Sequence, residues 1–347
     1  MNTVTAESSN LLERLLGGEE RALARAISLV ENEGADFEDL LHSLHDRVGG
    51  ARRIGITGPP GAGKSTLTAE LTRLLLDEGL KVGIIAVDPT SPFTGGALLG
   101  DRVRMVDLAM EPGVFIRSMA SRGSVGGLAT SSREAADLMD AAGYDRVILE
   151  TVGVGQSELD IAGSADTTVV VLVPESGDGI QAMKAGLMEV ADLFVVNKAD
   201  RPGAARLMKE IQVMMAIRRG HTLRGVPTHH HGIKMEVEAS EPVHEGGWES
   251  PVLQTTASTG EGIAGLAEQL DEHFAYLRES GDLLRRRQAN RLDRARAVLS
   301  RRVEHDATAV WEARLDELRD QLLDGRVSPY SVAEALYREI DRHRNGA

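Results

Sequence analysis

The chain has 347 residues, enough for about two domains or for one large domain with appendages. Its 39 basic and 53 acidic residues give a formal net charge of −14, so neither nucleic acid nor an anionic membrane is expected as its main partner. The composition is 42% hydrophobic, which predicts a sizeable core, and the absence of cysteine excludes disulfides, iron–sulfur clusters, thiolate zinc sites and thiol nucleophiles.

The sequence shows no segment that would carry it into or across a membrane. Its densest apolar run, residues 169–173, has the length of a strand, whereas a spanning helix needs about 20 apolar residues. The first residues lack the basic and apolar regions of a secretory signal peptide. We therefore expect a cytoplasmic protein, in agreement with the lack of cysteine.

Residues 1–50 are predicted to form an N-terminal helical extension. Leu23, Ile27 and Val30 recur at the spacing of one helical face. A second apolar stripe contains Leu40, Leu41, Leu44 and Val48. Paired glycines at 17–18 and 49–50 are typical of breaks between helices and bound this region.

Residues 51–278 alternate short, β-branched runs with helical patterns. The runs expected to be strands cover residues 53–57, 82–88, 146–150, 168–173, 193–197 and 252–256. Most of them are continuously apolar, as strands are when helices cover both faces of a sheet. This alternation predicts an α/β domain with a mostly parallel sheet.

One stretch of this domain, residues 221–250, does not fit the alternation. It combines prolines and paired glycines with His229, His230 and His231, and it is expected to be an irregular loop or insertion. A metal site at the three histidines is the weaker interpretation, because neighbours in an extended chain point in different directions.

Residues 279–347 are predicted to be helical again. One apolar stripe contains Leu292, Ala295, Leu299 and Val303, and another contains Trp311, Leu315, Leu318 and Leu322. Gly325 is expected to end this helical run, and Ser328 followed by Pro329 to begin a last helix. The stripes either pack on the parent domain or form a dimer arm, and the second interpretation predicts a homodimer.

The strongest motif is GPPGAGKS at residues 58–65, which matches G-x-x-x-x-G-K-[ST] in full, between a predicted strand and a predicted helix. Such a loop wraps backbone N–H groups around phosphates, and the helix start adds the positive end of its dipole. Lys64 is expected to contact the β- and γ-phosphates, and Ser65 to bind Mg²⁺. The nucleotide-binding residues predicted in this P-loop are Gly58, Gly61, Ala62, Gly63, Lys64, Ser65 and Thr66.

A second motif predicts that the base is guanine. Asn197, Lys198 and Asp200 form the pattern N-K-x-D at the end of a predicted strand. The Asp200 carboxylate can accept hydrogen bonds from N1–H and the exocyclic amine of guanine, whereas adenine would leave it unpaired at a cost of about 1–3 kcal/mol per group. Asn197 is expected to brace the loop, and the Lys198 stem to lie over the base. Downstream, Thr256 and Ala257 are predicted to contact the base, with the Ala257 N–H supporting the guanine oxygen.

Two acidic strand ends complete a predicted metal site. Asp88 and Glu150 each follow an apolar run, and Mg²⁺ prefers oxygen ligands in near-octahedral geometry. We therefore predict Ser65, Asp88 and Glu150 as the protein groups around Mg²⁺, partly through water. Gly153, three residues after Glu150, is expected to sense the γ-phosphate through its N–H group.

Longer stretches resemble one family of P-loop proteins. The sequences VDPTS at 87–91 and ETVGVGQSE at 150–158 resemble the SIMIBI class of GTPases. More narrowly, the chain is similar to the ArgK/MeaB subfamily, the methylmalonyl-CoA mutase-associated GTPases formerly named LAO/AO transport ATPases. The stretches that carry this second resemblance are residues 94–102, 121–128, 177–186 and 197–200. The resemblance covers residues 20–278, but not the stretch 221–250, and Thr256 stands where serine is usual.

The resemblance implies a GTP-hydrolysing chaperone of an adenosylcobalamin-dependent acyl-CoA mutase, most directly methylmalonyl-CoA mutase. Such a GTPase gates the loading of intact cofactor and favours the removal of damaged cofactor. An adenosyltransferase is a further candidate partner.

The resemblance also implies roles for individual residues. It places Asp88, Asp101 and Glu150 around Mg²⁺ and the γ-phosphate, with Asp101 and Glu150 catalytic together with Lys64. Residues 177–186 would be a mobile segment. On physical grounds, Lys184 of this segment and Arg104, which lies outside it, are the best candidates to neutralise charge on the transferring phosphoryl group, and Arg104 is the weaker of the two.

Two other functions fit parts of the sequence. The first is an amino-acid transport ATPase or kinase, but the N-K-x-D motif and the lack of a membrane segment argue against it. The second is a metal-insertion GTPase like the nickel chaperones of the same class, which the absence of cysteine makes weak. Nucleotide preference tests the first alternative, and metal content after purification tests the second.

Overall fold

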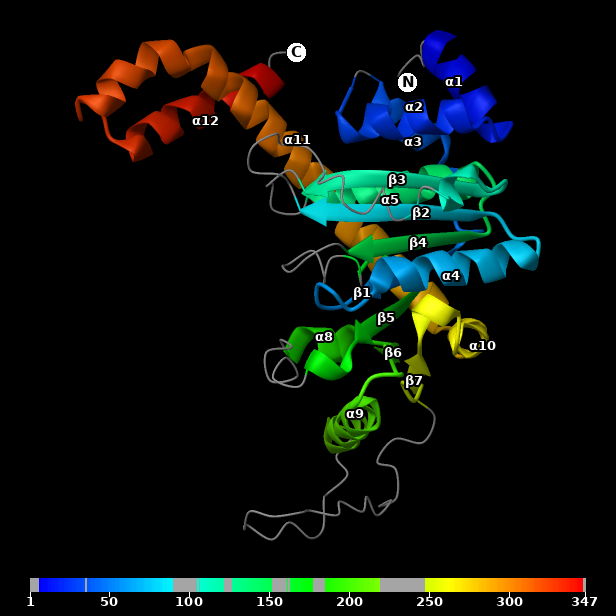
Figure 1. Ribbon diagram of the computed structural model, residues 1–347. Helices are drawn as coiled ribbons and strands as arrows, with labels where there is room; N and C mark the ends of the chain where they lie inside the picture. The colour runs from blue at the N-terminus through cyan, green and yellow to red at the C-terminus, as the bar shows by residue number, and fades with distance from the viewer. Residues whose placement is uncertain are drawn as a thin grey trace, which may run out of the picture. The chain divides into compact units, whose positions relative to one another are not determined.

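The computed structural model describes residues 6–34, 36–89, 105, 107–121, 127–151, 161, 163–176, 185–218 and 247–345. It divides into two compact units, Met1–Arg287 and Gln288–Ala347 (Figure 1). The first unit contains the sheet and its helices, and the second contains most of the C-terminal helical region.

A parallel sheet forms the centre of the first unit. Its strands are β1 (Arg52–Thr57), β2 (Val82–Pro89), β3 (Val114–Ser121), β4 (Arg146–Thr151), β5 (Thr167–Leu172), β6 (Leu193–Asn197) and β7 (Val252–Thr255). Their order is β3-β2-β4-β1-β5-β6-β7, and every neighbouring pair is parallel. The predicted parallel α/β architecture is therefore confirmed, and the six predicted strands agree with the structure to within one residue at each end.

The prediction missed the edge strand β3. Polar Arg117 and Ser118 interrupt its apolar run, and an edge strand needs only one neighbour, which is β2. In the structure the Arg117 guanidinium donates to Ser28 Oγ at 3.0 Å and pairs with Glu31 at 2.5 Å. Arg117, one of the two polar residues that interrupt the apolar run, thus attaches the strand to an N-terminal helix.

Helices cover both faces of the sheet. They are α4 (Lys64–Asp77), α5 (Gly127–Ala141), α8 (Ala185–Val190), α9 (Ala204–Arg218) and α10 (Ile263–Glu279). Helices α4 and α10 pack on the face that contains Ile56, Ile148 and Val169. Helices α5 and α9 pack on the opposite face, against residues such as Leu149 and Val170. This double cover explains why the strands are apolar along their whole length.

The N-terminal helices add a further layer over α5. They are α1 (Ala6–Leu16), α2 (Glu20–Glu31) and α3 (Phe37–Ser43). Leu23, Ile27 and Val30 are buried on one face of α2, in the same apolar cluster as the residues of α5. The predicted helical face of this segment is confirmed.

The second unit is a helical hairpin. Helix α11 (Asp282–Leu323) enters it and α12 (Pro329–Asn345) returns along it. Gly325 takes a left-handed conformation (φ 66°), and the Ser328 hydroxyl accepts a hydrogen bond from the Ser331 N–H at 3.1 Å. The predicted helix stop and N-cap are both confirmed, because their signals are local in sequence.

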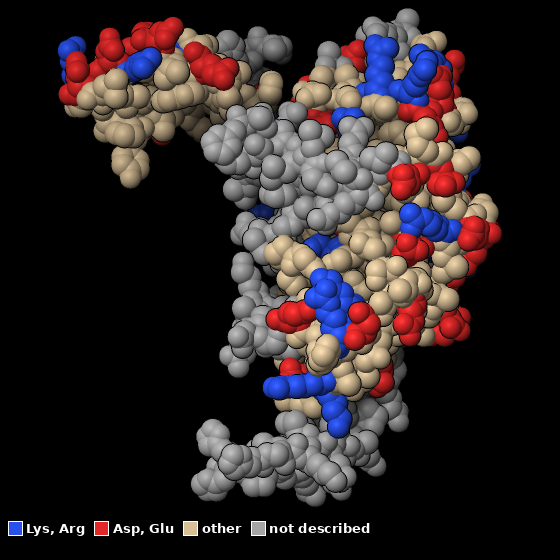
Figure 2. All heavy atoms as spheres, in the orientation of Figure 1, with Lys and Arg blue, Asp and Glu red and all other residues tan. Residues whose placement is uncertain are grey.

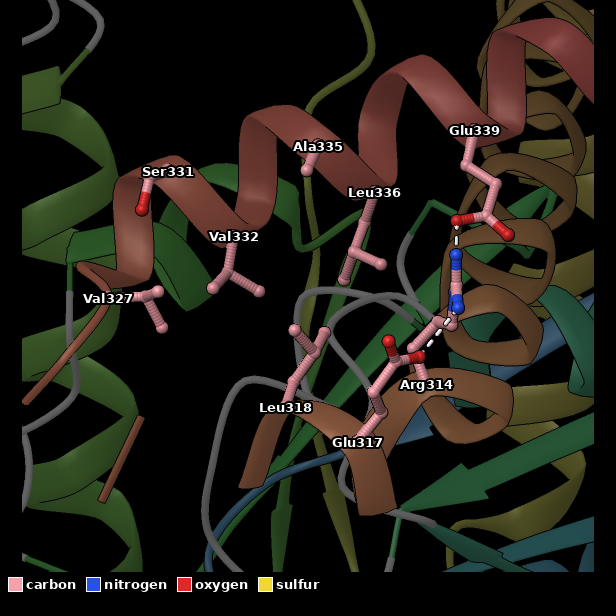
Figure 3. Close-up of a pocket in the computed structure, with 9 residues that line it drawn as sticks. All are labelled: Arg314, Glu317, Leu318, Val327, Ser331, Val332, Ala335, Leu336 and Glu339. Carbon is pink, nitrogen blue, oxygen red and sulfur yellow. Dashed lines mark hydrogen bonds and ion pairs between the residues drawn. The ribbon is translucent and has the colours of Figure 1, made fainter. Parts of the chain in front are cut away.

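Apolar side chains of the two helices line a groove of about 320 Å³ (Figure 3). Leu318 of α11 faces Val332 and Leu336 of α12, and Arg314 pairs with Glu317 and Glu339 at one end. The apolar residues that line the groove are Leu318, Val327, Val332, Ala335 and Leu336.

Charged side chains of both signs are interspersed over the described part of the face shown in Figure 2. Among the described helices, none combines the length and the apolar character needed to span a bilayer.

Candidate nucleotide-binding site

The predicted site residues meet at the carboxyl ends of neighbouring parallel strands. The P-loop follows β1, Glu150 lies near the end of β4, Asn197 ends β6, and Thr256 follows β7. In the sheet, β4 lies on one side of β1, and β6 and β7 lie on the other side beyond β5. Ligands of open α/β sheets bind at this edge, so the fold brings the two sequence motifs together although about 130 residues separate them.

The P-loop conformation requires glycine at its beginning and end. Gly58 has φ 138°, and a Cβ atom there would lie 2.1 Å from the carbonyl oxygen of Val171. Gly63 has φ 85°, and its Cβ would lie 2.5 Å from Asn197 Nδ2. Both positions combine a left-handed backbone with a close approach, which only glycine tolerates. The glycines of the motif thus allow the loop to pass between β5 and the Asn197 side chain.

Lys64 and Ser65 begin helix α4 and are both buried. The Lys64 ammonium donates to the carbonyl oxygens of Gly58 at 2.8 Å and Pro59 at 3.1 Å. This arrangement holds the ammonium against the loop, at the positive end of the helix dipole, where an anion is favoured.

The N-K-x-D motif holds the same loop from its other side. Asn197 Nδ2 donates to the Ala62 carbonyl at 2.8 Å, and Lys198 Nζ donates to the Gly61 carbonyl at 2.7 Å. Because N–H and C=O of a trans peptide point in opposite directions, the Gly63 N–H faces away from Asn197. This is the orientation that a phosphate-binding loop needs.

Ser65 and Glu150 form the pair expected beside a divalent cation. The Ser65 hydroxyl donates to Glu150 Oε1 at 2.6 Å, and both side chains are buried. A hydroxyl and a carboxylate oxygen at this separation suit Mg²⁺, which prefers hard oxygen ligands. Asp88 lies at the same edge, near the end of β2, and its side chain falls outside the described part of the structure.

Asn197 connects three loops of the site. Besides its bond to the P-loop, its Oδ1 accepts hydrogen bonds from Thr255 Oγ1 and the Ala257 N–H, both at 3.1 Å. The Ala257 N–H, predicted to support the guanine oxygen, therefore donates to Asn197 in this structure. Thr255 was not predicted as a site residue. Its position directly before Thr256 and Ala257 was the only sequence signal.

The segment after Asn197 presents Asp200 to solvent. Lys198 takes a left-handed conformation (φ 57°), and the Ala199 N–H donates to the Thr255 carbonyl at 3.0 Å. The turn leaves the Asp200 side chain exposed. An exposed carboxylate on a fixed loop can accept hydrogen bonds from a base. Thr66, in the first turn of α4, is exposed as well.

Several predicted residues lie outside the described part of the structure. They are Asp101, Arg104, Gly153, Lys184 and the run His229, His230 and His231. Among the described residues, no group of three or more histidine or acidic side chains could hold a metal ion.

The parallel sheet, the P-loop at the end of β1 and the N-K-x-D loop that fastens it define a P-loop protein that binds guanine nucleotides. Residues 23–312 match the family described as methylmalonyl Co-A mutase-associated GTPase MeaB. The chain therefore belongs to the MeaB family, and it is a GTP-hydrolysing enzyme.

Similar proteins agree with this assignment. A Pyrococcus horikoshii protein named as a GTPase is 43% identical over 95% of this chain and 97% of its own length. A mouse mitochondrial protein, the methylmalonic aciduria type A homolog, is 31% identical over 95% of this chain and 79% of its own. The solved structure of a LAO/AO transport system kinase is 29% identical, with a TM-score of 0.64 over 98% of this chain and 100% of that chain.

Proposed function

We propose that this GTPase is a chaperone of an adenosylcobalamin-dependent acyl-CoA mutase, most directly methylmalonyl-CoA mutase. It would gate the loading of intact cofactor and favour the removal of damaged cofactor. The observation that carries the proposal is the match of residues 23–312 to a family described by its association with that mutase. The name of the mouse relative supports the same assignment. An adenosyltransferase is a further proposed partner, and the cytoplasm is the proposed location.

In the proposed mechanism the N–H groups of the P-loop and Lys64 bind the β- and γ-phosphates. Lys64 is already held within 2.8 Å of the loop, so little reorganisation is needed when the anion binds. The Ser65 hydroxyl and the Glu150 carboxylate would hold Mg²⁺, together with Asp88. When bound, Mg²⁺ supplies positive charge against the phosphate oxygens.

Base recognition is assigned to the loop after β6. We place guanine against Asp200, with the Lys198 stem over the base, while Asn197 keeps this loop attached to the P-loop. Thr256 and Ala257 close the proposed base site from β7. Asp101, Gly153 and Lys184 complete the proposal on the phosphate side from their sequence positions alone.

The experiment that tests the chaperone function measures GTP hydrolysis with and without a candidate mutase, for the wild type and Lys184→Ala. Catalysis of phosphoryl transfer depends on positioning and charge, so a partner that positions Lys184 should raise a slow basal rate. We expect stimulation in the wild type and loss of most of it in Lys184→Ala. Lys81→Ala removes an exposed lysine at the amino end of β2 and is the matched control.

Unchanged rates with every adenosylcobalamin-dependent mutase tested would reject the chaperone function and leave GTP binding intact. The competing function, suggested by the name of the similar transport system kinase, is amino-acid transport. If the protein had that function, ATP would bind to the nucleotide site as tightly as GTP does, and competition binding of the two nucleotides measures this.

A homodimer is proposed from the C-terminal hairpin. Leu292, Leu299 and Val303 follow one another at helical spacing along α11 and remain exposed within the chain, by 75%, 62% and 42%. An apolar stripe of this length in water is typical of a surface that another chain covers.

A further inference from the structure

The ends of β1 and β4 are joined by a second pair of side chains. Thr151 Oγ1 donates to Thr57 Oγ1 at 3.2 Å, and both side chains are fully buried. Thr57 is the last residue of β1, and Thr151 is the last residue of β4. The two hydroxyls therefore lie at the carboxyl edge of the sheet, where the P-loop begins.

This hydrogen bond extends the contact between the strands beyond their backbone ladder. The last ladder pair joins Ile56 to Glu150. The next residue, Thr57, is paired with Val170 of β5, and Gly58 then begins the P-loop with φ 138°. The threonine pair thus ties the first residue before the P-loop to the first residue after Glu150.

The pair lies on the opposite face of the sheet from the Glu150 side chain. Glu150 points to the face of Ile148, which packs in the cluster with α4. Because successive residues of a strand alternate, Thr151 points to the other face. Glu150 is consequently fixed from two directions, by the Ser65 hydroxyl on one face and by the threonine pair on the other.

We infer that Thr151 is a positioning residue for GTP hydrolysis. Through Thr57 it holds the backbone of Glu150 at a fixed distance from the P-loop, and so sets the separation of the Ser65 and Glu150 oxygens. Displacements well under 1 Å alter catalysis that depends on positioning. The inference rests on the proposed placement of Mg²⁺ and phosphates between the P-loop and Glu150.

The test compares Thr151→Val, which keeps the shape and removes the hydroxyl, with Thr151→Ser, which keeps the hydroxyl. We expect Thr151→Val to lower kcat about tenfold, equivalent to about 1.4 kcal/mol, with KM for GTP within about twofold of wild type. The Mg²⁺ concentration for half-maximal rate should rise several-fold. Thr151→Ser should recover most of the rate.

Two further variants separate positioning from stability. Thr57→Val should lower kcat as Thr151→Val does, and the double variant should lose little more, because both remove the same bond. Thr72→Val is the matched control: its buried hydroxyl donates to the Thr68 carbonyl at 2.7 Å inside α4, away from the site. It should lower the melting temperature without altering kcat.

Wild-type kcat in Thr151→Val would overturn the inference, as would a loss that Thr151→Ser does not restore or a loss confined to KM. Should Thr151→Val fail to fold, Thr57→Val and Thr151→Ser decide the question in the same way. Hydrolysis by the wild type that needs no Mg²⁺ would instead reject the proposed metal site.

Discussion

Individual side chains preorganise this site through backbone carbonyls. Lys64, Asn197 and Lys198 donate to carbonyls of the P-loop at 2.7–3.1 Å. Because these bonds fix the loop in the chain by itself, its N–H groups need little reorganisation when phosphate binds. Asp200, the residue proposed to recognise the base, does not hydrogen-bond to the P-loop in the described contacts, and its side chain is exposed.

Asp200→Asn should therefore change specificity without disturbing the loop. The amide can donate to the oxygen that replaces the exocyclic amine in xanthine, so affinity for GTP should fall and affinity for xanthine nucleotides should rise. Equilibrium binding of both nucleotides measures the change, with Asp77→Asn, an exposed residue at the far end of α4, as the control. Equal affinity of the wild type for ATP and GTP would contradict the assignment.

At the scale of elements, the N-terminal part of α11 is hydrogen-bonded to the amino ends of the strands, at the end of the sheet opposite the nucleotide site. Arg286 makes two hydrogen bonds to the Asp192 carboxylate, at 2.8 and 3.0 Å. Arg287 makes two to the Asp166 carboxylate, at 2.8 and 2.9 Å. Arg287 also donates to the Ala51 carbonyl at 3.0 Å, just before β1. One turn of α11 thus connects the loops that precede β1, β5 and β6.

Asp192 makes the stability of this junction depend on pH. Burial by itself would raise the pKa of Asp192, but His273 and Arg286 hold it below the ordinary value of 3.8. The carboxylate also accepts the Thr168 N–H at 2.8 Å. Since the pKa is lower in the folded state, the stabilisation is complete above about pH 4 and is lost as the pH falls through the folded-state value.

Asp192→Asn should cost about 1–3 kcal/mol at neutral pH, because it removes the charge partner of Arg286, whose side chain is 41% exposed and is therefore partly screened by solvent. The free energy of unfolding of the variant should also depend less on pH below 4 than that of the wild type. Urea unfolding at several pH values measures both effects. Asp271→Asn is the control, since its exposed carboxylate pairs with Arg52 and Arg146 and should contribute less than about 1 kcal/mol. Equal losses in the two variants would contradict this account.

At the scale of the whole molecule, the two units differ in how many of their described apolar residues are buried. The first unit has three clusters of buried apolar side chains around its sheet. In the second unit Val332 is the buried apolar residue among those described, whereas Leu323, Tyr330 and Tyr337 are exposed. A hairpin with so little core gains stability when another surface covers it.

Leu299→Glu should convert the proposed dimer into a monomer that still binds GTP. A charge in the middle of the apolar stripe would be desolvated in the dimer and hydrated in the monomer. Light scattering at micromolar concentration reports the mass, and Ser300→Glu, an exposed neighbour on the same helix, is the control. A wild type that is monomeric under these conditions would contradict the proposed dimer.

The sequence by itself determined the elements and motifs whose signals are local. Apolar runs predicted six of the parallel strands, GPPGAGKS predicted the strand–loop–helix unit of the P-loop, and Ser328 and Pro329 predicted the start of α12. These features depend on the conformations of a few consecutive residues, so composition and spacing are sufficient to predict them.

Only the tertiary structure decided which side chains meet. The partners Thr57 and Thr151 are 94 residues apart, and Arg286 and Asp192 are also 94 residues apart. The tertiary structure also decided that the edge strand β3 pairs with β2 despite its polar residues. It likewise decided that the Ala257 N–H donates a hydrogen bond to Asn197. Such contacts follow from the order in which strands join the sheet, and that order is set by the packing of all the helices together and not by any single segment.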